Sequence, residues 1–488
     1  MLFPAPVIAS LRDAPSEPAL QDGSRTVSRG ELLGMVWRLV GGLRDVGVRP
    51  GMGVGMVLTL SPEAYAAHLA AHVLGCRVAT ARPGWGARQL AGTLWGHSDV
   101  VVADQPVDGP ALRLDDLLSH RGPGACAAGL ADPDGIARLT YTSGSTGRPK
   151  ACAHTYRAIS LAYQPEQWPP VLARLLTGAP AGAAPNGSPA AAGEETPRAP
   201  LSFERCLIHQ SLASPAMFTY LGRTLVVGGM AVLPGGLALP EAVERYRITA
   251  TIMPPPRLHA LIQSGADLSS LRALVLGGSP AGSQLLRAAT ERLGPIVWQG
   301  YGQGEAGIIS MLTPQDILAG HEASVGRPVP TVEVDIRDGE VCVRSPHLMA
   351  GYWDDPEQTR DVLRDGWLHT RDLGYLDDAG LLHLTGRTRD VIMVNAEVCY
   401  AGAIERVLAT HPAVAEAYVA GAPDPDTGEA IHAFVVPAGD MVPDREVLAK
   451  LVREQLSANN VPATLTVVSQ VPVSPSGKPD KRALLALP

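Results

Sequence analysis

The chain has few lysines, few cysteines and no long apolar run. Only four of its 488 residues are lysine, so generic surface lysine is scarce and each one is worth locating. The six cysteines are widely scattered, and none forms a C-x-x-C or another metal-ligand spacing. A zinc site or a disulfide framework is therefore not expected. The cysteines are expected to be reduced thiols in the cytoplasm.

Two further absences concern targeting and partners. No window reaches the uninterrupted apolar length that a membrane span needs. The first residues, "MLFPAPVIASLRDAP", lack the basic region and the long apolar run of a signal peptide. The net charge of −8 argues against nucleic acid as a main partner. These observations predict a cytoplasmic protein without a membrane span.

The chain alternates helical and strand patterns and is too long for one hydrophobic core. "SRGELLGMVWRLVGGLRDVG" begins as a capped helix, because Glu31 follows Ser28 by three residues. "GMGVGMVLTL" and "DVVVAD" are typical of buried strands, and "SPEAYAAHLAAHVLG" of a helix between them. This alternation predicts a layered α/β fold with parallel strands.

The middle of the chain adds further strands and a hairpin. "TLVVGGMAVLP", "ITATIMPP" and "LRALVLGGSPAG" are predicted as buried strands that feed loops at their carboxyl ends, where open α/β sheets bind ligands. "TVEVDIRDGEVCVRSP" predicts a hairpin around its Asp-Gly turn. Residues 180–200 lack core-forming side chains and are predicted to be a mobile surface loop. The helical character of the last hundred residues indicates a second, smaller domain.

The stretch "LTYTSGSTGRPKACAHT" carries the first chemical signal. Residues 142–147 offer hydroxyl groups and backbone N–H groups but no apolar face, so they predict a loop. Arg148 and Lys150 add two positive charges to it. Such a loop suits a polyanion, and a nucleoside triphosphate is the commonest one in a cell.

Five motifs in a fixed order then define a resemblance. "YTSGSTGRPK" is followed by "GYGQGEAG", "GEVCVRSPHLMAGYWDDPEQT", "GWLHTRDLGYLDDAGLLHLTGRTRDVI" and "PVSPSGKPDKRAL". The set resembles the adenylate-forming superfamily of acyl- and aryl-CoA synthetases, peptide-synthetase adenylation domains and luciferases, over nearly the whole chain. The resemblance implies an α/β fold with a large N-terminal multi-sheet domain (1–388), with helices packed between the sheets. A small mobile α+β C-terminal domain (389–488) would follow.

The resemblance also implies how ATP is held. The loop would cradle the β- and γ-phosphates, Tyr301 would stack on adenine, Asp372 would accept hydrogen bonds from the ribose, and Arg387 would contact the ribose or a phosphate. The segment 278–280 would lie along the adenine. The full set of implied nucleotide-binding residues is Ser143, Gly144, Ser145, Thr146, Gly147, Lys150, Gly278, Ser279, Pro280, Tyr301, Gly302, Asp372 and Arg387.

Three residues are implied in catalysis: Thr142, Glu305 and Lys478. Glu305 would hold Mg²⁺, since a carboxylate is tolerable beside phosphates only with a cation between them. Lys478 matches the family's C-terminal catalytic lysine. When a carboxylate attacks the α-phosphate, two anions approach, and a lysine at that point stabilises the transition state more than the ground state.

The sequence departs from the family pattern at several positions. Gly304 replaces a usual threonine, so one hydroxyl is lost beside the α-phosphate. Asn395 and Ala396 occupy positions where relatives carry glycine beside the pantetheine arm, which puts the thioester-forming step in doubt. Arg389 occupies the hinge position, and Ser214 the mouth of the acyl pocket.

The pocket side chains are expected from residues 214–221, 277–281 and 299–304, and their small or apolar character fits an uncharged aryl or aliphatic acid. The leading hypothesis is an ATP-dependent acid–thiol ligase. It would use ATP and Mg²⁺ to activate a small carboxylic acid and pass the acyl group to CoA or to the phosphopantetheine of a free-standing acyl carrier protein. A second interpretation keeps adenylation but uses a non-thiol nucleophile. A third is a degenerate nucleotide-binding protein of the same fold, which the joint retention of Lys150, Glu305, Asp372, Arg387 and Lys478 disfavours.

Overall fold

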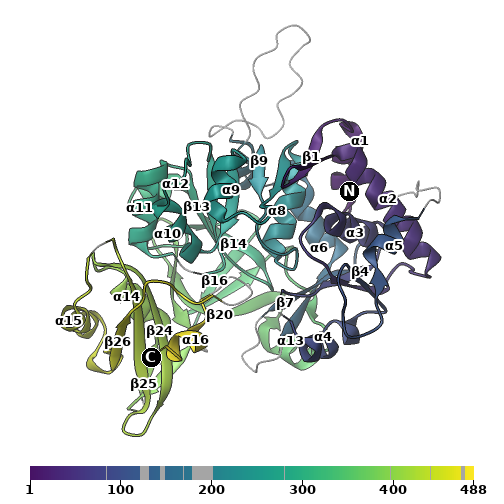
Figure 1. Cartoon of the computed structure of the whole chain (residues 1–488). Coiled ribbons are helices and arrows are strands. Elements are labelled where there is room, and N and C mark those ends of the chain that lie inside the picture. Colours follow the sequence, from purple (N-terminus) through teal and green to yellow (C-terminus); the bar gives the residue numbers. More distant parts are fainter. Residues whose placement is uncertain are drawn as a thin grey trace.

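The computed structural model describes most of the chain (Figure 1). The described ranges are 1–83, 85–120, 131–142, 149–168, 170–178, 202–279, 281–388, 390–395, 397–439, 441–473 and 479–487. Within them, no helix is long and apolar enough to cross a membrane. The predicted mobile loop at 180–200 lies outside the described residues.

Two large sheets, mostly parallel in their central strands, make up the N-terminal part of the described chain. The first has the strand order β18-β8-β7-β4-β3-β5-β6, and the second β15-β14-β13-β12-β11-β9-β10-β1-β2. The strands of the first sheet are β3 (Gly53–Val57), β4 (Arg77–Thr80), β5 (Val100–Ala103), β6 (Leu112–Arg113), β7 (Ile136–Thr142), β8 (Lys150–Thr155) and β18 (Gly351–Tyr352). Those of the second are β1 (Pro18–Asp22), β2 (Arg25–Ser28), β9 (Arg205–Leu207), β10 (Met230–Leu233), β11 (Ala250–Met253), β12 (Ala273–Leu276), β13 (Val297–Gln303), β14 (Gly307–Leu312) and β15 (Arg327–Pro328).

Two smaller sheets follow in sequence. The third is antiparallel, with β16 (Glu333–Arg337), β17 (Glu340–Arg344), β19 (Leu363–Arg364), β20 (Trp367–Leu376) and β21 (Leu382–Arg387). The predicted Asp-Gly hairpin is confirmed, because Arg337 pairs with Glu340 across the turn. The fourth contains β22 (Val391–Val394), β23 (Glu397–Tyr400), β24 (Val414–Asp424), β25 (Gly428–Pro437) and β26 (Thr464–Val467).

The helices cover and separate the sheets. They are α1 (Ala5–Asp13), α2 (Arg29–Asp45), α3 (Pro62–Val73), α4 (Ala87–Gly92), α5 (Leu114–Leu118), α6 (Tyr156–Ser160), α7 (Pro170–Thr177), α8 (Pro215–Val226), α9 (Leu239–Arg245), α10 (Pro255–Gln263), α11 (Ser283–Leu293), α12 (Pro314–Leu318), α13 (Pro356–Val362), α14 (Ala401–Leu408), α15 (Arg445–Gln455) and α16 (Lys481–Leu485). The capping box that the sequence predicts for α2 is confirmed, since Ser28 and Glu31 bond each other's backbone N–H groups.

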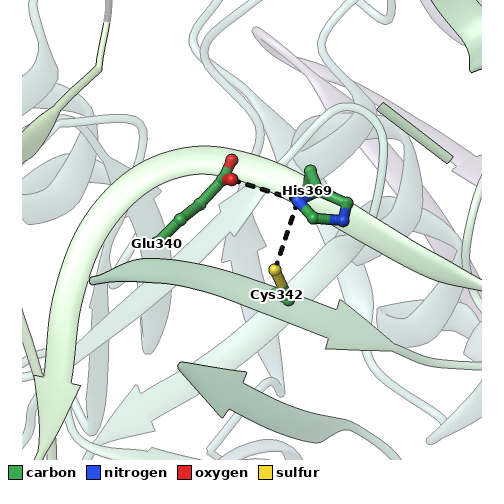
Figure 2. Close-up of side chains that lie close together, drawn as sticks. All are labelled: Glu340, Cys342 and His369. Atoms are coloured by element: carbon green, nitrogen blue, oxygen red, sulfur yellow. Dashed lines mark hydrogen bonds and ion pairs between the residues drawn. The ribbon is translucent and has the colours of Figure 1, made fainter. Parts of the chain in front are cut away.

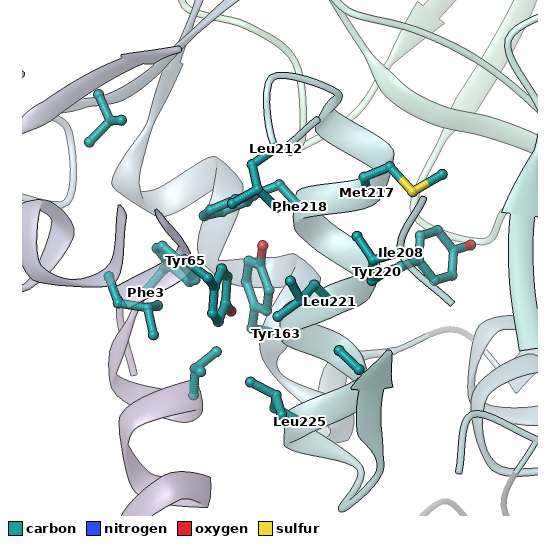
Figure 3. Close-up of a cluster of buried hydrophobic side chains, with 14 of the residues drawn as sticks. Phe3, Tyr65, Tyr163, Ile208, Leu212, Met217, Phe218, Tyr220, Leu221 and Leu225 are labelled. Carbon is teal, nitrogen blue, oxygen red and sulfur yellow. The ribbon is translucent and has the colours of Figure 1, made fainter. Parts of the chain in front are cut away.

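Helix α3 explains why the two large sheets form one core. Only Glu63 among its residues is not buried, and apart from Glu63, His68 and His72 its side chains are alanine, proline, leucine, valine and tyrosine, as suits a helix buried on all sides. Figure 3 shows the cluster beside it, where Tyr65 of α3 lies near Phe3, Tyr163 and Phe218. The α/β fold with helices packed between sheets is thereby confirmed.

One predicted strand differs from the structure. Residues 224–226 of "TLVVGGMAVLP" complete helix α8, and only Met230–Leu233 forms a strand, β10. A short apolar run fits a buried helix as well as a buried strand, so periodicity could not separate the two.

The C-terminal elements have a core of their own. Ile392, Ile404, Val419, Ile431 and Leu448 belong to a hydrophobic cluster formed from residues 392–452. In Figure 1 these elements form a group beside α10 and α11. Gly282, next to α11, approaches the carbonyl of Ala415 in β24, and Gln284 Nε2 donates to the carbonyl of Thr410 at 3.4 Å. The predicted boundary at 388/389 stays a prediction, because Arg389 lies outside the described residues.

Candidate active site

The carboxyl ends of two neighbouring strands open the site. Strands β12 and β13 run parallel, with Leu276 paired to Gln299. Gly278, just after β12, has φ +91°, a left-handed conformation that favours glycine. The side-chain oxygens Ser279 Oγ and Gln299 Oε1 are buried and have no hydrogen-bond partner within the described ranges. Buried polar atoms are normally paired, so these two are ready to bind a polar ligand.

Asp372 on β20 is the centre of a hydrogen-bonded cluster. Its Oδ2 accepts from Tyr301 Oη and from Gln303 Nε2, both at 2.6 Å, and its Oδ1 accepts from Arg387 Nε at 2.5 Å. Asp372 pairs with Arg387 across β20 and β21, and the two donors from β13 reach it from the second sheet. The structure thus brings together Tyr301, Asp372 and Arg387, three of the residues that the resemblance implies.

The electrostatics of this cluster follow from burial and charge pairing. The Asp372 side chain is 7% exposed and forms an ion pair with Arg387, whose side chain is 49% exposed. Burial, followed by the Asp372 carboxylate, raises the pKa of Tyr301 well above its usual value. Tyr301 therefore keeps its proton and donates to the carboxylate. Because about half of the Arg387 side chain is exposed, its guanidinium can also contact an anion beside the Asp372–Arg387 ion pair.

Glu305 lies in a second cluster, built from the first and second sheets. Its Oε1 accepts from Tyr352 Oη at 2.9 Å, and the Lys150 ammonium lies 4.9 Å from the centre of the same tyrosine ring. Thr142 and Lys150 pair at the ends of β7 and β8, so they fix both ends of the predicted phosphate loop. Ser143, Gly144, Ser145, Thr146 and Gly147 lie outside the described residues, and their predicted role stays a prediction.

Gly304 joins Thr142 to this cluster. A Cβ atom at Gly304 would lie 2.5 Å from Thr142 Cγ2, which is closer than real Cβ contacts come. His154 Nε2 lies 2.8 Å from the carbonyl oxygen of Gly304 and fixes the backbone there. Burial, and then the nearby Glu305 carboxylate, raise the pKa of the Cys152 thiol, so it stays protonated. Gly304 stands where relatives carry threonine, and Thr142 occupies the space that a side chain at position 304 would need.

Gly302 shows why a side chain is excluded from this strand. A Cβ there would collide with the carbonyl oxygen of Gly307 across the β13–β14 pair. The remaining predicted residues, Pro280 and Lys478, lie outside the described residues. Beyond Lys478, the chain is anchored by Lys481, whose ammonium forms a 2.7 Å ion pair with Glu405 on α14.

The hairpin between β22 and β23 contains one of the departures from the family pattern. Asn395 has φ +52°, so it keeps the left-handed conformation without being glycine. Its Nδ2 donates to Asn459 Oδ1 at 3.0 Å, and Asn459 Nδ2 donates to Glu397 at 2.7 Å. Ala396 lies outside the described residues. The asparagine therefore adds side-chain bonds that a glycine would lack.

Residues of α8 that are expected to line the acid pocket also belong to the hydrophobic core, and their role in the pocket stays a prediction. Ser214 is the N-cap of α8, and Met217, Phe218 and Leu221 are at most 2% exposed (Figure 3). An apolar helix beside a loop gives no sequence signal that separates pocket-lining from core positions.

A cavity of about 260 Å³ opens nearby, at the carboxyl ends of β3, β4 and β9. Its lining includes Arg82, Trp85 and His209. Arg82 donates to the carbonyl of Tyr141, next to Thr142, so the cavity adjoins the Glu305 cluster. His209 lies between the Ile252 carbonyl and Arg257, at 2.7 and 2.6 Å, and burial, then Arg257, lower its pKa to about 4.

Sequence reasoning missed Tyr352 and His209 as site residues, and it placed Gln303 only in the expected acid pocket, not beside Asp372. Gln303 and Tyr352 stand inside the quoted motifs "GYGQGEAG" and "GYWDDPEQT", so position in a motif was the available signal. His209 lies two residues after the last residue of strand β9, and a histidine just beyond the carboxyl end of a parallel strand was the signal for it.

Known proteins resemble the chain over its whole length. Residues 9–353 match the family model described as AMP-binding enzyme, and residues 403–478 match the AMP-binding enzyme C-terminal domain. A feruloyl-CoA synthase from Amycolatopsis sp is 31% identical over 96% of this chain and 95% of its own.

Two solved structures extend the comparison. The amide bond synthetase McbA from Marinactinospora thermotolerans is 33% identical, with a TM-score of 0.78 and 99% of both chains covered. The o-succinylbenzoate CoA synthetase MenE from Bacillus subtilis, in complex with ATP and magnesium ion, is 26% identical, with a TM-score of 0.79 and 98% of both chains covered.

Proposed function

The chain belongs to the family of AMP-binding, adenylate-forming enzymes, and we propose that it joins a small carboxylic acid to AMP and then passes the acyl group to an amine. In the first step a carboxylate oxygen bonds to the α-phosphorus of ATP and pyrophosphate leaves. In the second step the amine nitrogen bonds to the carbonyl carbon, AMP leaves and the nitrogen loses a proton. The cluster of Tyr301, Gln303, Asp372 and Arg387 is the observation that carries the first step.

The site fits a nucleotide by its unsatisfied and charged groups. Ser279 Oγ and Gln299 Oε1 are buried without partners among the described residues, at the strand ends beside Tyr301. Asp372 offers a buried carboxylate to hydroxyl donors, and Arg387 offers a half-exposed guanidinium to an anion. Mg²⁺ bound at Glu305 would supply charge neutralisation for the phosphates.

The catalytic lysine is part of the proposal. Lys478 would stabilise charge on the oxygens around the α-phosphate, with the small domain rotating about Arg389 to bring it there and away again. Lys481 and Glu405 form the ion pair that anchors the following helix α16 to the small domain.

Two observations favour an amine acceptor. The amide bond synthetase McbA matches 99% of the chain at 33% identity. Asn395 replaces a glycine at the turn where the resemblance brings the pantetheine arm, and its amide is bonded to Asn459. A side chain at this position narrows the approach for a thiol arm.

A thiol acceptor is the second candidate function. The feruloyl-CoA synthase that matches 96% of the chain at 31% identity favours it. CoA and the phosphopantetheine of an acyl carrier protein are then the alternatives. The cavity of about 260 Å³ beside Trp85 suits a small organic acid in either case.

The test is exchange of labelled pyrophosphate into ATP across a panel of aryl and aliphatic acids, followed by product masses with amines, CoA and a phosphopantetheinylated carrier. Exchange with an amide product supports the proposal, and exchange with only a thioester establishes the second candidate. Exchange by Lys478→Ala should fall about 10²–10³-fold. Unchanged exchange in that variant would refute the lysine's role, and no exchange with any acid would refute adenylation.

A further inference from the structure

Three metal-ligating side chains meet on the third sheet, away from the Glu305 cluster. Glu340 and Cys342 stand on β17, and His369 stands opposite Cys342 on β20, where the two residues pair. Figure 2 shows the three side chains pointing toward one another. Glu340 and Cys342 lie two positions apart on the strand, which places their side chains on the same face.

The cluster is held together by one ring nitrogen. His369 Nδ1 lies 3.0 Å from Glu340 Oε2 and 3.5 Å from Cys342 Sγ. This nitrogen carries at most one proton, so it cannot donate to the carboxylate and also accept from the thiol. An ion that accepts a lone pair from each group would satisfy all three at once.

Two of the three separations between ligand atoms are close to those of a tetrahedral zinc centre. With Zn–S near 2.3 Å and Zn–N or Zn–O near 2.0–2.1 Å, such a centre separates S from N by roughly 3.5 Å and N from O by roughly 3.3 Å. The observed separations are 3.5 Å and 3.0 Å, and all three ligand atoms lie within 4.8 Å of one another. Closing around an ion thus needs side-chain shifts of about 1 Å or less.

We propose that Glu340, Cys342 and His369 form a binding site for a borderline divalent cation of the Zn²⁺ class, with water in the fourth position. The backbone N–H of Arg371 donates to the other oxygen of Glu340 at 2.7 Å and orients the carboxylate. Cys342 is buried, whereas the His369 and Glu340 side chains are 17% and 21% exposed, so the ion enters from their side.

This site is chemically distinct from the proposed magnesium site. A thiolate and an imidazole select zinc or a related ion, whereas Mg²⁺ requires oxygen ligands in octahedral geometry. The ligands come from two strands, 27 residues apart for Cys342 and His369, which is why the cysteine spacing gave no zinc signal.

The experiment uses the full-length protein, without an affinity tag and after removal of metal. Zn²⁺ alone is titrated by calorimetry, and Co²⁺ alone is followed by absorption, where a thiolate ligand gives a charge-transfer band in the near ultraviolet. We expect one ion per chain and a thiolate–cobalt band. Cys342→Ser should abolish the band and weaken Zn²⁺ binding at least about tenfold, and His369→Gln should weaken it similarly.

The matched control is Cys206→Ser, which alters a buried thiol on β9 outside the cluster. It should bind both ions as the unchanged protein does. Equal cobalt bands in Cys342→Ser and the unchanged protein would overturn the proposal, as would the absence of any ion after dialysis against Zn²⁺. If Cys342→Ser does not fold, zinc X-ray absorption on the unchanged protein decides: one sulfur neighbour near 2.3 Å supports the site, and none overturns it.

Discussion

The Asp372 and Glu305 clusters both present a carboxylate to the candidate site, but they balance its charge differently. Asp372 is neutralised by Arg387 and accepts two further side-chain donors. Glu305 accepts from the Tyr352 hydroxyl, and the Lys150 ammonium lies 4.9 Å from the centre of the same tyrosine ring. A carboxylate that pairs with an arginine is suited to receive the hydroxyl groups of a ribose, and one that accepts from a tyrosine hydroxyl is suited to receive a cation.

The largest expected effect is at Glu305. Glu305→Gln keeps an oxygen that accepts from Tyr352 but removes the charge, so ATP–pyrophosphate exchange should fall about 10²–10³-fold, as for loss of a group that stabilises transition-state charge. The apparent Mg²⁺ requirement should rise. Tyr352→Phe is the control, because it keeps the aromatic ring and the Glu305 charge but removes the hydroxyl that donates to Glu305. Exchange in Glu305→Gln equal to that of Tyr352→Phe would contradict a metal-binding role.

A smaller effect is expected at Asp372. Asp372→Asn keeps the shape of the side chain but removes the charge that pairs with Arg387. Its NH₂ group is a donor and replaces one of the two oxygens that accept from Tyr301 and Arg387. The KM for ATP should rise about ten- to a hundredfold, since a hydrogen bond to a charged group is worth about 1.5–3 kcal/mol. The KM for Mg²⁺ should change little. Steady-state exchange at varied ATP and varied Mg²⁺ separates the two, and a larger shift for Mg²⁺ than for ATP would reverse our assignment of the clusters.

The sequence predicted these clusters unequally, for physical reasons. Local features such as the Ser28 capping box and the Asp338–Gly339 hairpin depend on neighbours in the chain, so they were predictable. Asp372 and Arg387 pair across adjacent strands and lie within ordered motifs. Contacts between distant segments carry no local signal.

The Tyr352–Glu305 hydrogen bond and the Cys342–His369 contact both join such distant segments, and each appeared only in the folded chain. Residues 224–226 show the other limit. They form a short apolar run that joined a helix instead of a strand, because so short a run has no periodicity that separates the two.

The next effect in size, below that at Asp372, is expected at Gly304, which lies beside Thr142 in the Glu305 cluster. Gly304→Thr restores the family's usual residue, but its Cβ would lie 2.5 Å from Thr142 Cγ2. Overpacking of about 1–3 kcal/mol predicts a fall in exchange of roughly tenfold. Thr142→Ser removes the colliding methyl group, so the double variant should recover most of the loss. If the two losses simply add, the steric account of Gly304 is wrong.

The smallest expected effect is a difference in acid sensitivity between the two sides of the site. Burial lowers the pKa of His154 to about 4, below the usual 6.5, and its Nε2 lies against the Gly304 carbonyl. The unfolded chain therefore binds a proton that the folded one does not between pH 6.5 and 4. Stability from this group is complete above pH 6.5 and is lost as the pH falls, by about 1.4 kcal/mol per unit.

His154→Gln keeps an N–H donor for Gly304 but does not titrate. Its thermal unfolding midpoint should therefore fall less between pH 6.5 and 4.5 than that of the unchanged protein. His432→Gln is the matched control, because His432 is on β25 of the fourth sheet and its Nδ1 lies 2.8 Å from Thr464 Oγ1. Unfolding midpoints of His154→Gln and of the unchanged protein that fall equally with pH would show that the Gly304 carbonyl does not hold a neutral imidazole. The expected difference in acid sensitivity between the two clusters would then be absent.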